Sequence, residues 1–311
     1  MKKNKNIILN GVIDLAQPRL GTKVVYKTDE FFAAAKRIIE PSPPIFKEGA
    51  FDKNGKWMDG WETRRKRKSG NDYLILKLGK PGRIHRVDID TSYFNGNQPN
   101  KVSLDVCSSK KNIPKKNQKW KNILSQKTTG PNRHHFFNVK KTSVITHLRL
   151  NIFPDGGIAR LRLFGELENK KFESKIINLT SVLNGSVPIA CNNEHFGRAE
   201  NVLAPGQGKN MGDGWETRRS RGKNFDWLII KCAAPAKIGK IQIDTHHFKG
   251  NYPDKCSIQA AYIGKKISAG KIINKSKNWK LLLSKSKLND HKKHNFFNKI
   301  MKKNKVNYLK I

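Results

Sequence analysis

The sequence lacks a long apolar run, and this absence excludes a membrane-spanning segment. The first apolar stretch, IILNGVIDLA, is interrupted by Asn10 and Asp14 and falls far short of the roughly 20 residues that a span requires. Cysteines are also few, and they show neither CxxC spacing nor a Cys/His ligand pattern: Cys107, Cys191, Cys232 and Cys256. We therefore expect a soluble, cytoplasmic protein with reduced thiols and no membrane partner.

Acidic residues are scarce as well, with 24 Asp and Glu against 63 Lys and Arg and a formal net charge of +39. A field of that sign attracts nucleic acids, anionic membranes or small acidic substrates. The lysines, however, are scattered among Asn and Ile along the whole chain, as in KKNIPKKNQKWKNIL. This pattern favours a general drift in composition over a dedicated polyanion-binding patch, and we do not expect a nucleic acid partner.

Several catalytic signatures are also missing. The chain contains no HExxH, GxSxG, Walker loop or GxGxxG. Their absence argues against a zinc protease, a serine hydrolase and a nucleotide-dependent enzyme.

What the chain has instead is an internal duplication. The string DGWETRR occurs twice, 154 residues apart, at Asp59 and Asp213, and the same spacing relates two copies of DTxxFxGNxPxK. The spacing grows to 164 upstream and is 160 downstream, where RHHFFN matches KHNFFN. Similarity over this length predicts two homologous halves, residues 1–169 and 170–311, joined by the charged stretch ENKKFESK.

Most of each half has the pattern of short strands. Segments such as YLILKLGK, KVSLDVC and ARLRLFGEL alternate or run apolar over roughly 4–8 residues, between Gly, Pro and Asn clusters. Each half is expected to open with a short helix, and in the first half Thr28 precedes DEFFAAAK and is a candidate cap. We predict an all-β fold of two tandem β-sandwich repeats, for which a jelly-roll is a common arrangement.

The second half ends early in comparison with the first. Leu150 aligns with Ile311, so nothing in the second half corresponds to NIFPDGGIARLRLFGE (151–166). Those residues supply a turn and a final strand in the first half. We therefore expect the second repeat to lack its C-terminal strand and to expose an unpaired edge.

Two interpretations of DGWETRR are open. In a strand that follows an Asp-Gly turn, side chains alternate, so Glu62 and Arg64 share one face while Trp61 lies on the other. A structural role would place the tryptophan in the core and pair the glutamate with an arginine. A functional role would direct the arginines and acids toward an anionic ligand, because guanidinium groups bind carboxylates bidentately.

The second repeated motif also has two interpretations. In its second copy, Asp244 and His246 lie two residues apart, a spacing that suits a carboxylate orienting an imidazole or an acid and base acting together. The alternative is that the aspartate caps a turn. Asp155, in PDGG of the first half, is likewise a turn residue first and a binding residue second.

Taken together, the doubled DGWETRR, the DTxxFxGNxP segments and LNIFPDGGIARLRLFG resemble the allantoicase family along nearly the whole chain. The resemblance implies two jelly-roll repeats, assembly into a homo-oligomer, and hydrolysis of allantoate to ureidoglycolate and urea in purine (allantoin) degradation. The chain departs from the pattern in its missing second PDGG segment, in its lysine load, and in Thr-Ser-Tyr at 91–93 where the second copy has Thr-His-His.

Allantoate is a small carboxylate that carries two ureido groups. Its site needs cations for the carboxylate, donors and acceptors for the ureas, and an acid–base pair for the departing urea and the attacking water. We expect the substrate to be bound by Arg64, Arg65, Arg218, Arg219 and Asp155. We expect acid–base catalysis by Glu62, Glu216, Asp244 and His246. The sequence gives no sign of a cofactor. Use of a divalent metal is an open alternative, because Asp, Glu and His can ligate a metal without a sequence signature.

Two other functions stay open. A non-catalytic jelly-roll module that binds carbohydrate or a polyanion would expose Trp61 and Trp215 as stacking platforms. A nucleic acid binder would concentrate its lysines on one face and lose affinity steeply with salt.

Overall fold

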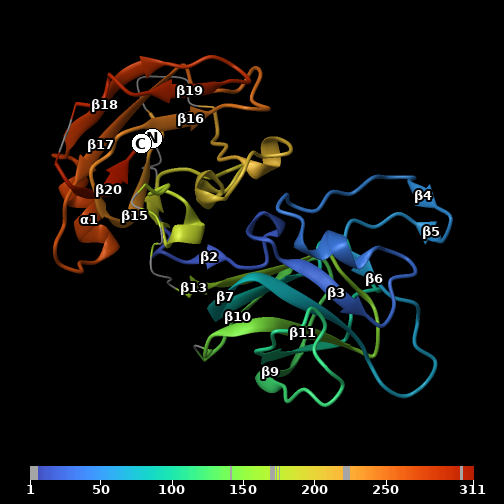
Figure 1. The fold of residues 1–311 in the computed structure, drawn as a ribbon. Helices are drawn as coiled ribbons and strands as arrows, with labels where there is room; N and C mark the ends of the chain where they lie inside the picture. The colour runs from blue at the N-terminus through green and yellow to red at the C-terminus, as the bar shows by residue number, and fades with distance from the viewer. Residues whose placement is uncertain are drawn as a thin grey trace. The chain divides into compact units, whose positions relative to one another are not determined.

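The structure is a computed structural model that describes residues 6–140, 142–168, 172, 174, 176–219, 225–301 and 304–311. It separates into two compact units, Ile13–Glu168 and a second that joins Met1–Val12 to Asn169–Ile311 (Figure 1). We call them the first and second repeat. The boundary predicted near residue 169 stays a prediction, and most of the expected linker lies outside the described residues. The N-terminal residues join the second repeat, because β1 pairs with β14.

The first repeat consists almost entirely of strands. Its elements are β2 (Ile13–Asp14), η1 (Pro18–Leu20), β3 (Lys23–Lys27), η2 (Ala35–Ile39), β4 (Phe51–Asp52), β5 (Gly55–Lys56), β6 (Trp61–Glu62), β7 (Asp72–Asp90), β8 (Lys101–Cys107), β9 (Lys121–Thr128), β10 (His134–Asn138), β11 (Ile145–Phe153), β12 (Gly157–Ile158) and β13 (Arg160–Leu167).

Strand β7 organises the first repeat because it contributes to two layers. Its first part pairs with β3 and β11, and its last part, from Gly82 to Asp90, pairs with β10 and β13. The change of partners falls around Pro81, which has no N–H for a ladder hydrogen bond. Apolar side chains from both parts are completely buried, among them Leu74, Leu76, Ile84, Val87 and Ile89. This is a β-sandwich whose layers share one long strand.

The second repeat repeats this plan with shorter pieces. Its elements are β1 (Ile7–Ile8), η3 (Val182–Asn184), β14 (Val187–Cys191), η4 (Ala199–Leu203), η5 (Met211–Asp213), β15 (Leu228–Ala236), β16 (Ile241–Asp244), β17 (Lys255–Ala261), α1 (Ala269–Ser276), β18 (Lys280–Lys287), β19 (Lys293–Phe296) and β20 (Val306–Lys310). Within the described residues, β16 pairs with β19 alone, whereas the corresponding part of β7 has partners on both sides. The prediction of an all-β fold with two homologous repeats is confirmed.

The prediction of a helix after Thr28 is wrong. No α-helix forms there: Ala33 and Glu62 exchange backbone hydrogen bonds, and only a 3-10 turn, η2, follows. The Thr28 hydroxyl donates to Asp72 Oδ1 at 2.8 Å instead of capping a helix. A contact with a distant strand has overridden the local helix signal.

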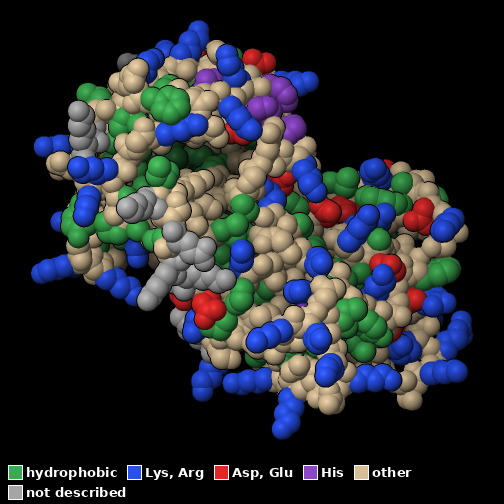
Figure 2. All heavy atoms as spheres, in the orientation of Figure 1, with side chains coloured by type: hydrophobic (Ala, Val, Ile, Leu, Met, Phe, Trp, Pro, Cys, Tyr) green, Lys and Arg blue, Asp and Glu red, His purple; other side chains and the backbone are tan. Residues whose placement is uncertain are grey.

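None of the helices in the described part of the chain has the length and apolar character of a membrane span. Lys and Arg side chains are scattered over both repeats on the face drawn in Figure 2, and they do not gather in one patch there.

Candidate active site

In the first repeat, DGWETRR forms the short strand β6, which is held on both sides. It pairs with β12 on one side and with Ala33 on the other. A Cβ on Gly60 would lie 2.4 Å from the carbonyl oxygen of Ile158, so the motif needs glycine for this close approach. Trp61 is completely buried and donates its indole N–H to the carbonyl of Asp29 at 2.7 Å. It therefore cannot serve as an exposed stacking platform, which a sugar-binding module would need.

The two repeated motifs meet at a Glu–Asn pair in each half of the chain. Glu62 Oε1 accepts a hydrogen bond from Asn97 Nδ2 at 2.8 Å, and Glu216 Oε1 accepts one from Asn251 Nδ2 at 2.6 Å. Burial raises the pKa of Glu62 above its ordinary value, although the Asn97 hydrogen bond opposes this shift. Glu62 thus keeps its proton to higher pH than an exposed glutamate.

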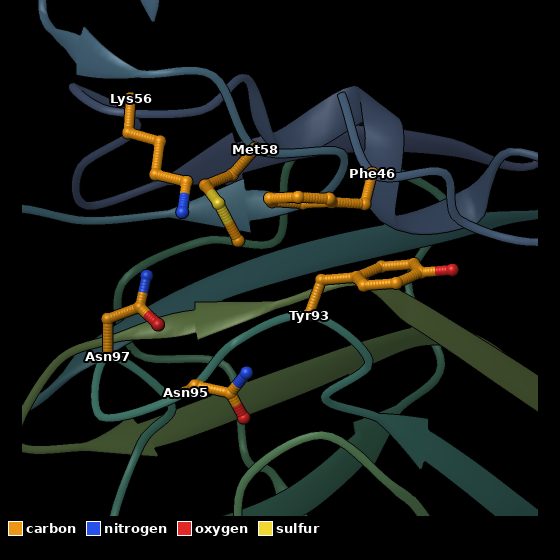
Figure 3. A pocket seen from close by; sticks show the side chains of 6 residues that line it. All are labelled: Phe46, Lys56, Met58, Tyr93, Asn95 and Asn97. Atoms are coloured by element: carbon orange, nitrogen blue, oxygen red, sulfur yellow. The ribbon is translucent and has the colours of Figure 1, made fainter. Parts of the chain in front are cut away.

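A pocket of about 270 Å³ lies beside the Glu62–Asn97 pair. It is lined by Phe46, Lys56, Met58, Tyr93, Asn95 and Asn97. In Figure 3, one side of the pocket is formed by Lys56, Met58 and Phe46. Tyr93 and the two asparagines face them from the other side. Because Asn97 both lines the pocket and holds Glu62, a carboxyl group with a raised pKa lies one hydrogen bond from the pocket wall.

The aromatic part of the pocket is a stacked pair. The rings of Phe46 and Tyr93 lie 5.7 Å apart between centroids with planes inclined by 24°. The Lys56 ammonium lies 4.9 Å from the centroid of the Phe46 ring. The pocket therefore offers a planar apolar surface, a cation and two amides in a small space. Its volume is just below the roughly 300–1,000 Å³ of pockets for drug-sized ligands, so it suits a smaller compound.

Part of this pocket comes from a connection that is longer in the first repeat than in the second. The spacing between the repeats is 164 residues at Ala35 but 154 at Trp61, so the first repeat carries ten additional residues between them. This segment forms the β4–β5 hairpin and contributes Phe46 and Lys56. Sequence reasoning missed both residues, although the change in spacing was the signal that could have found them.

The arginines expected to bind substrate lie elsewhere. Arg64 donates from Nε and Nη2 to Asp29 Oδ1 at 3.0 and 2.8 Å, and it does not pair with Glu62. Burial of Asp29 raises its pKa, but the hydrogen bonds from Arg64 outweigh this and leave the pKa below its ordinary value. Arg65 is exposed, as are Arg218 and Arg219 in the second repeat. The described pocket is lined by none of the four.

Two aspartates of the first repeat stabilise turns. Asp155 Oδ2 accepts the backbone N–H of Lys66 at 2.6 Å, which ties the PDGG turn to the residues after DGWETRR. Asp59 Oδ2 forms a buried ion pair with Arg160 Nη2 at 2.7 Å. Asp155 is thus placed as a structural residue, and its expected substrate contact remains a prediction.

In the second repeat, the Asp244 carboxylate does two things at once. Its Oδ1 accepts the backbone N–H of His246 at 2.8 Å and contacts the ring Nδ1 of His246 at 2.7 Å. Both interpretations of this spacing therefore hold in the geometry: the aspartate caps the turn after β16 and also orients an imidazole. The His246 ring lies 4.8 Å from that of His291. The catalytic role expected for these residues remains a prediction.

No group of three or more His, Cys, Asp or Glu side chains in the described residues is placed to hold a metal ion. All four cysteines are buried as free thiols. Burial raises the pKa of Cys107 and Cys256 to about 11, and that of Cys191 and Cys232 to about 12. Thiols held protonated in this way are poor nucleophiles.

Comparisons with known proteins agree on one family. The model of the allantoicase repeat matches residues 13–168 and 177–311. A probable allantoicase of Pseudomonas fluorescens (strain Pf0-1) is 45% identical over 302 residues, which cover 96% of this chain and 91% of that protein. Probable allantoicase 1 of Burkholderia mallei (strain ATCC 23344) is 46% identical over 287 residues, covering 91% and 85%. The crystal structure of allantoicase from Saccharomyces cerevisiae superposes with a TM-score of 0.79 at 34% identity, covering 97% of this chain and 88% of that one.

Proposed function

This chain belongs to the allantoicase family, and we propose that it hydrolyses allantoate to ureidoglycolate and urea at a reaction centre in its first repeat. The observation that carries the proposal is the contact between Glu62 and Asn97, which joins a carboxyl group of raised pKa to the wall of a small polar pocket. The reaction belongs to purine degradation.

The pocket matches the chemistry of the substrate. Each ureido group is planar and carries both donors and an acceptor, as do the side-chain amides of Asn95 and Asn97. The stacked faces of Phe46 and Tyr93 suit planar groups of this kind.

Glu62 supplies the proton that the reaction requires. The bond between the central carbon and one ureido nitrogen breaks, and its electron pair goes to that nitrogen, which takes a proton from the Glu62 carboxyl group. The remaining ureido nitrogen stabilises the electron-poor carbon. Water then forms the new C–O bond and returns a proton to the Glu62 carboxylate, so ureidoglycolate and urea leave with atoms and charge balanced. Burial raises the pKa of Glu62, which favours its role as the acid of the first step.

Asn97 positions this acid. Its side chain donates to Glu62 Oε1, and in this proposal the other carboxyl oxygen carries the proton. The equivalent pair in the second repeat is Glu216 with Asn251. The connection before DGWETRR is ten residues shorter there, so we assign the reaction to the first repeat.

The test is direct. Purified protein is incubated with allantoate, with and without a divalent metal, and urea and ureidoglycolate are measured. We expect equal amounts of both products. A folded sample that releases neither under either condition would overturn the proposal.

The proposal also covers the location of the protein, its oligomeric state and the class of its partner. Four free buried thiols support a reducing, cytoplasmic location. Assembly into a homo-oligomer is expected from the family, and light scattering on the purified protein would measure it. The scattered Lys and Arg side chains in Figure 2 support a small-molecule substrate over a nucleic acid.

A further inference from the structure

Lys56 carries the one charge among the six side chains that line the pocket in the described part of the chain. It comes from the connection that precedes DGWETRR, which is ten residues longer in the first repeat than in the second. Resting on the proposed function, we propose that Lys56 binds the carboxylate of the substrate and makes the pocket selective for acidic ureido compounds.

The direction of the side chain supports this role. Figure 3 shows the Lys56 ammonium extending into the pocket, toward the amide of Asn97 on the opposite wall. Two other lysines of the first repeat are held in ion pairs, Lys27 with Glu30 at 2.9 Å and Lys66 with Asp72 at 2.8 Å. Lys56 instead lies over the Phe46 ring, an interaction that fixes the ammonium without cancelling its charge.

Nearby arginines are not available for the same task. The guanidinium of Arg64 is held by Asp29 and lies over the ring of Phe31. Arg160 is buried against Asp59 and donates further hydrogen bonds to backbone carbonyls. A carboxylate entering the pocket therefore meets the ammonium of Lys56 as its nearest cationic partner among the lining residues.

This placement also divides the substrate among the walls of the pocket. The carboxylate lies at Lys56, on the side of the β4–β5 hairpin, and a ureido group lies against the amides of Asn95 and Asn97. The ureido group on the Asn97 side is then the one nearest to Glu62, which is bonded to Asn97. Recognition of the carboxylate thus decides which ureido group reaches the acid.

The test uses two probes that resemble the substrate but lack the carbon with two ureido groups, so the reaction cannot consume them. N-carbamoylglycine carries one ureido group and a carboxylate, and its neutral amide, N-carbamoylglycinamide, differs only in lacking the charge. Calorimetric titration measures both affinities for the full chain and for Lys56→Met, Lys56→Arg and Lys53→Met. Methionine keeps the unbranched stem that packs on Phe46, and Lys53 is a matched control because it is an exposed lysine of the same hairpin.

We expect Lys56→Met to weaken N-carbamoylglycine about 10–150-fold, the range for a lost charge-assisted hydrogen bond, and to change the neutral amide less than about twofold. Lys56→Arg should recover most of the affinity, and Lys53→Met should bind like the wild type. Equal losses for both probes would assign Lys56 a structural role and overturn the inference, as would an unchanged affinity for the acid or no binding to the wild type. If the acid binds in a Lys56-dependent way but allantoate releases no urea, the recognition stands and the proposed hydrolysis fails.

Discussion

Replacing Glu62 with glutamine tests the reaction centre with a minimal change in shape. Glutamine keeps a carbonyl oxygen that can accept from Asn97 Nδ2, the contact that spans 2.8 Å in the structure. It cannot give up or take a proton near neutral pH. The variant should therefore fold and bind substrate while losing the acid that protonates the departing urea.

The size of the expected loss follows from that role. A positioned general acid or base contributes roughly 10²–10⁴-fold to a rate. We expect kcat for allantoate to fall by about that factor, which corresponds to about 3–5 kcal/mol of transition-state stabilisation, with KM changed only slightly. Because burial raises the pKa of Glu62, the wild-type rate should also fall as the pH rises through that pKa, and this alkaline limb should be absent from the residual activity of the variant.

The chain supplies a matched control for this experiment. Glu216 makes the same contact with Asn251, at 2.6 Å, but in the repeat without the β4–β5 segment. Urea release measured under saturating allantoate should be near normal in Glu216→Gln. Near-normal turnover in Glu62→Gln would refute the reasoning, and a large loss in Glu216→Gln alone would move the reaction centre to the second repeat.

Three other predictions concern stability. Since the native state holds the Glu62 proton more tightly than the unfolded chain, its contribution is complete below the ordinary pKa of 4.5 and is lost as pH rises through the raised value; Glu62→Gln should thus raise the thermal midpoint at pH 8 and hardly change it at pH 4. Arg160→Ala leaves the Asp59 carboxylate without its ion-pair partner, and denaturant titration should show a loss of about 3–5 kcal/mol. Gly157→Ala places a Cβ 1.9 Å from the ring of Phe94, and the same titration should show about 1–3 kcal/mol of destabilisation. A change below about 0.5 kcal/mol in either of the last two variants would contradict the packing described.

Local patterns predicted the strands well because periodicity is a property of neighbouring residues. KVSLDVC coincides with β8, and ARLRLFGEL contains β13. The prediction of a helix after Thr28 failed for the opposite reason, since Ala33 pairs with Glu62, which lies far along the chain. The duplication predicted the two repeats, because it is visible in the sequence itself.

The site was only partly predictable. Glu62 could be selected from its repeated motif, and so could the motif that contains Asn97, but their contact depends on how β6 and the turn after β7 fold together. The ion pair of Arg64 could not be predicted, because its partner, Asp29, lies 35 residues upstream and no local pattern links the two residues. Arg64 was therefore expected to bind substrate instead. Lys56 lies in the connection whose length differs between the repeats, so a comparison at a fixed spacing did not select it.

The longer segment of the first repeat has a low thermodynamic cost. Residues 40–60 connect η2 to β6, whereas residues 204–214 connect η4 to the second DGWETRR tryptophan, so the connection is about twice as long in the first repeat. Loop-closure entropy grows only with the logarithm of length, and each doubling costs about 0.6 kcal/mol. After a gene duplication, the two copies can therefore differ in the wall that they give to a pocket at almost no expense to either sandwich.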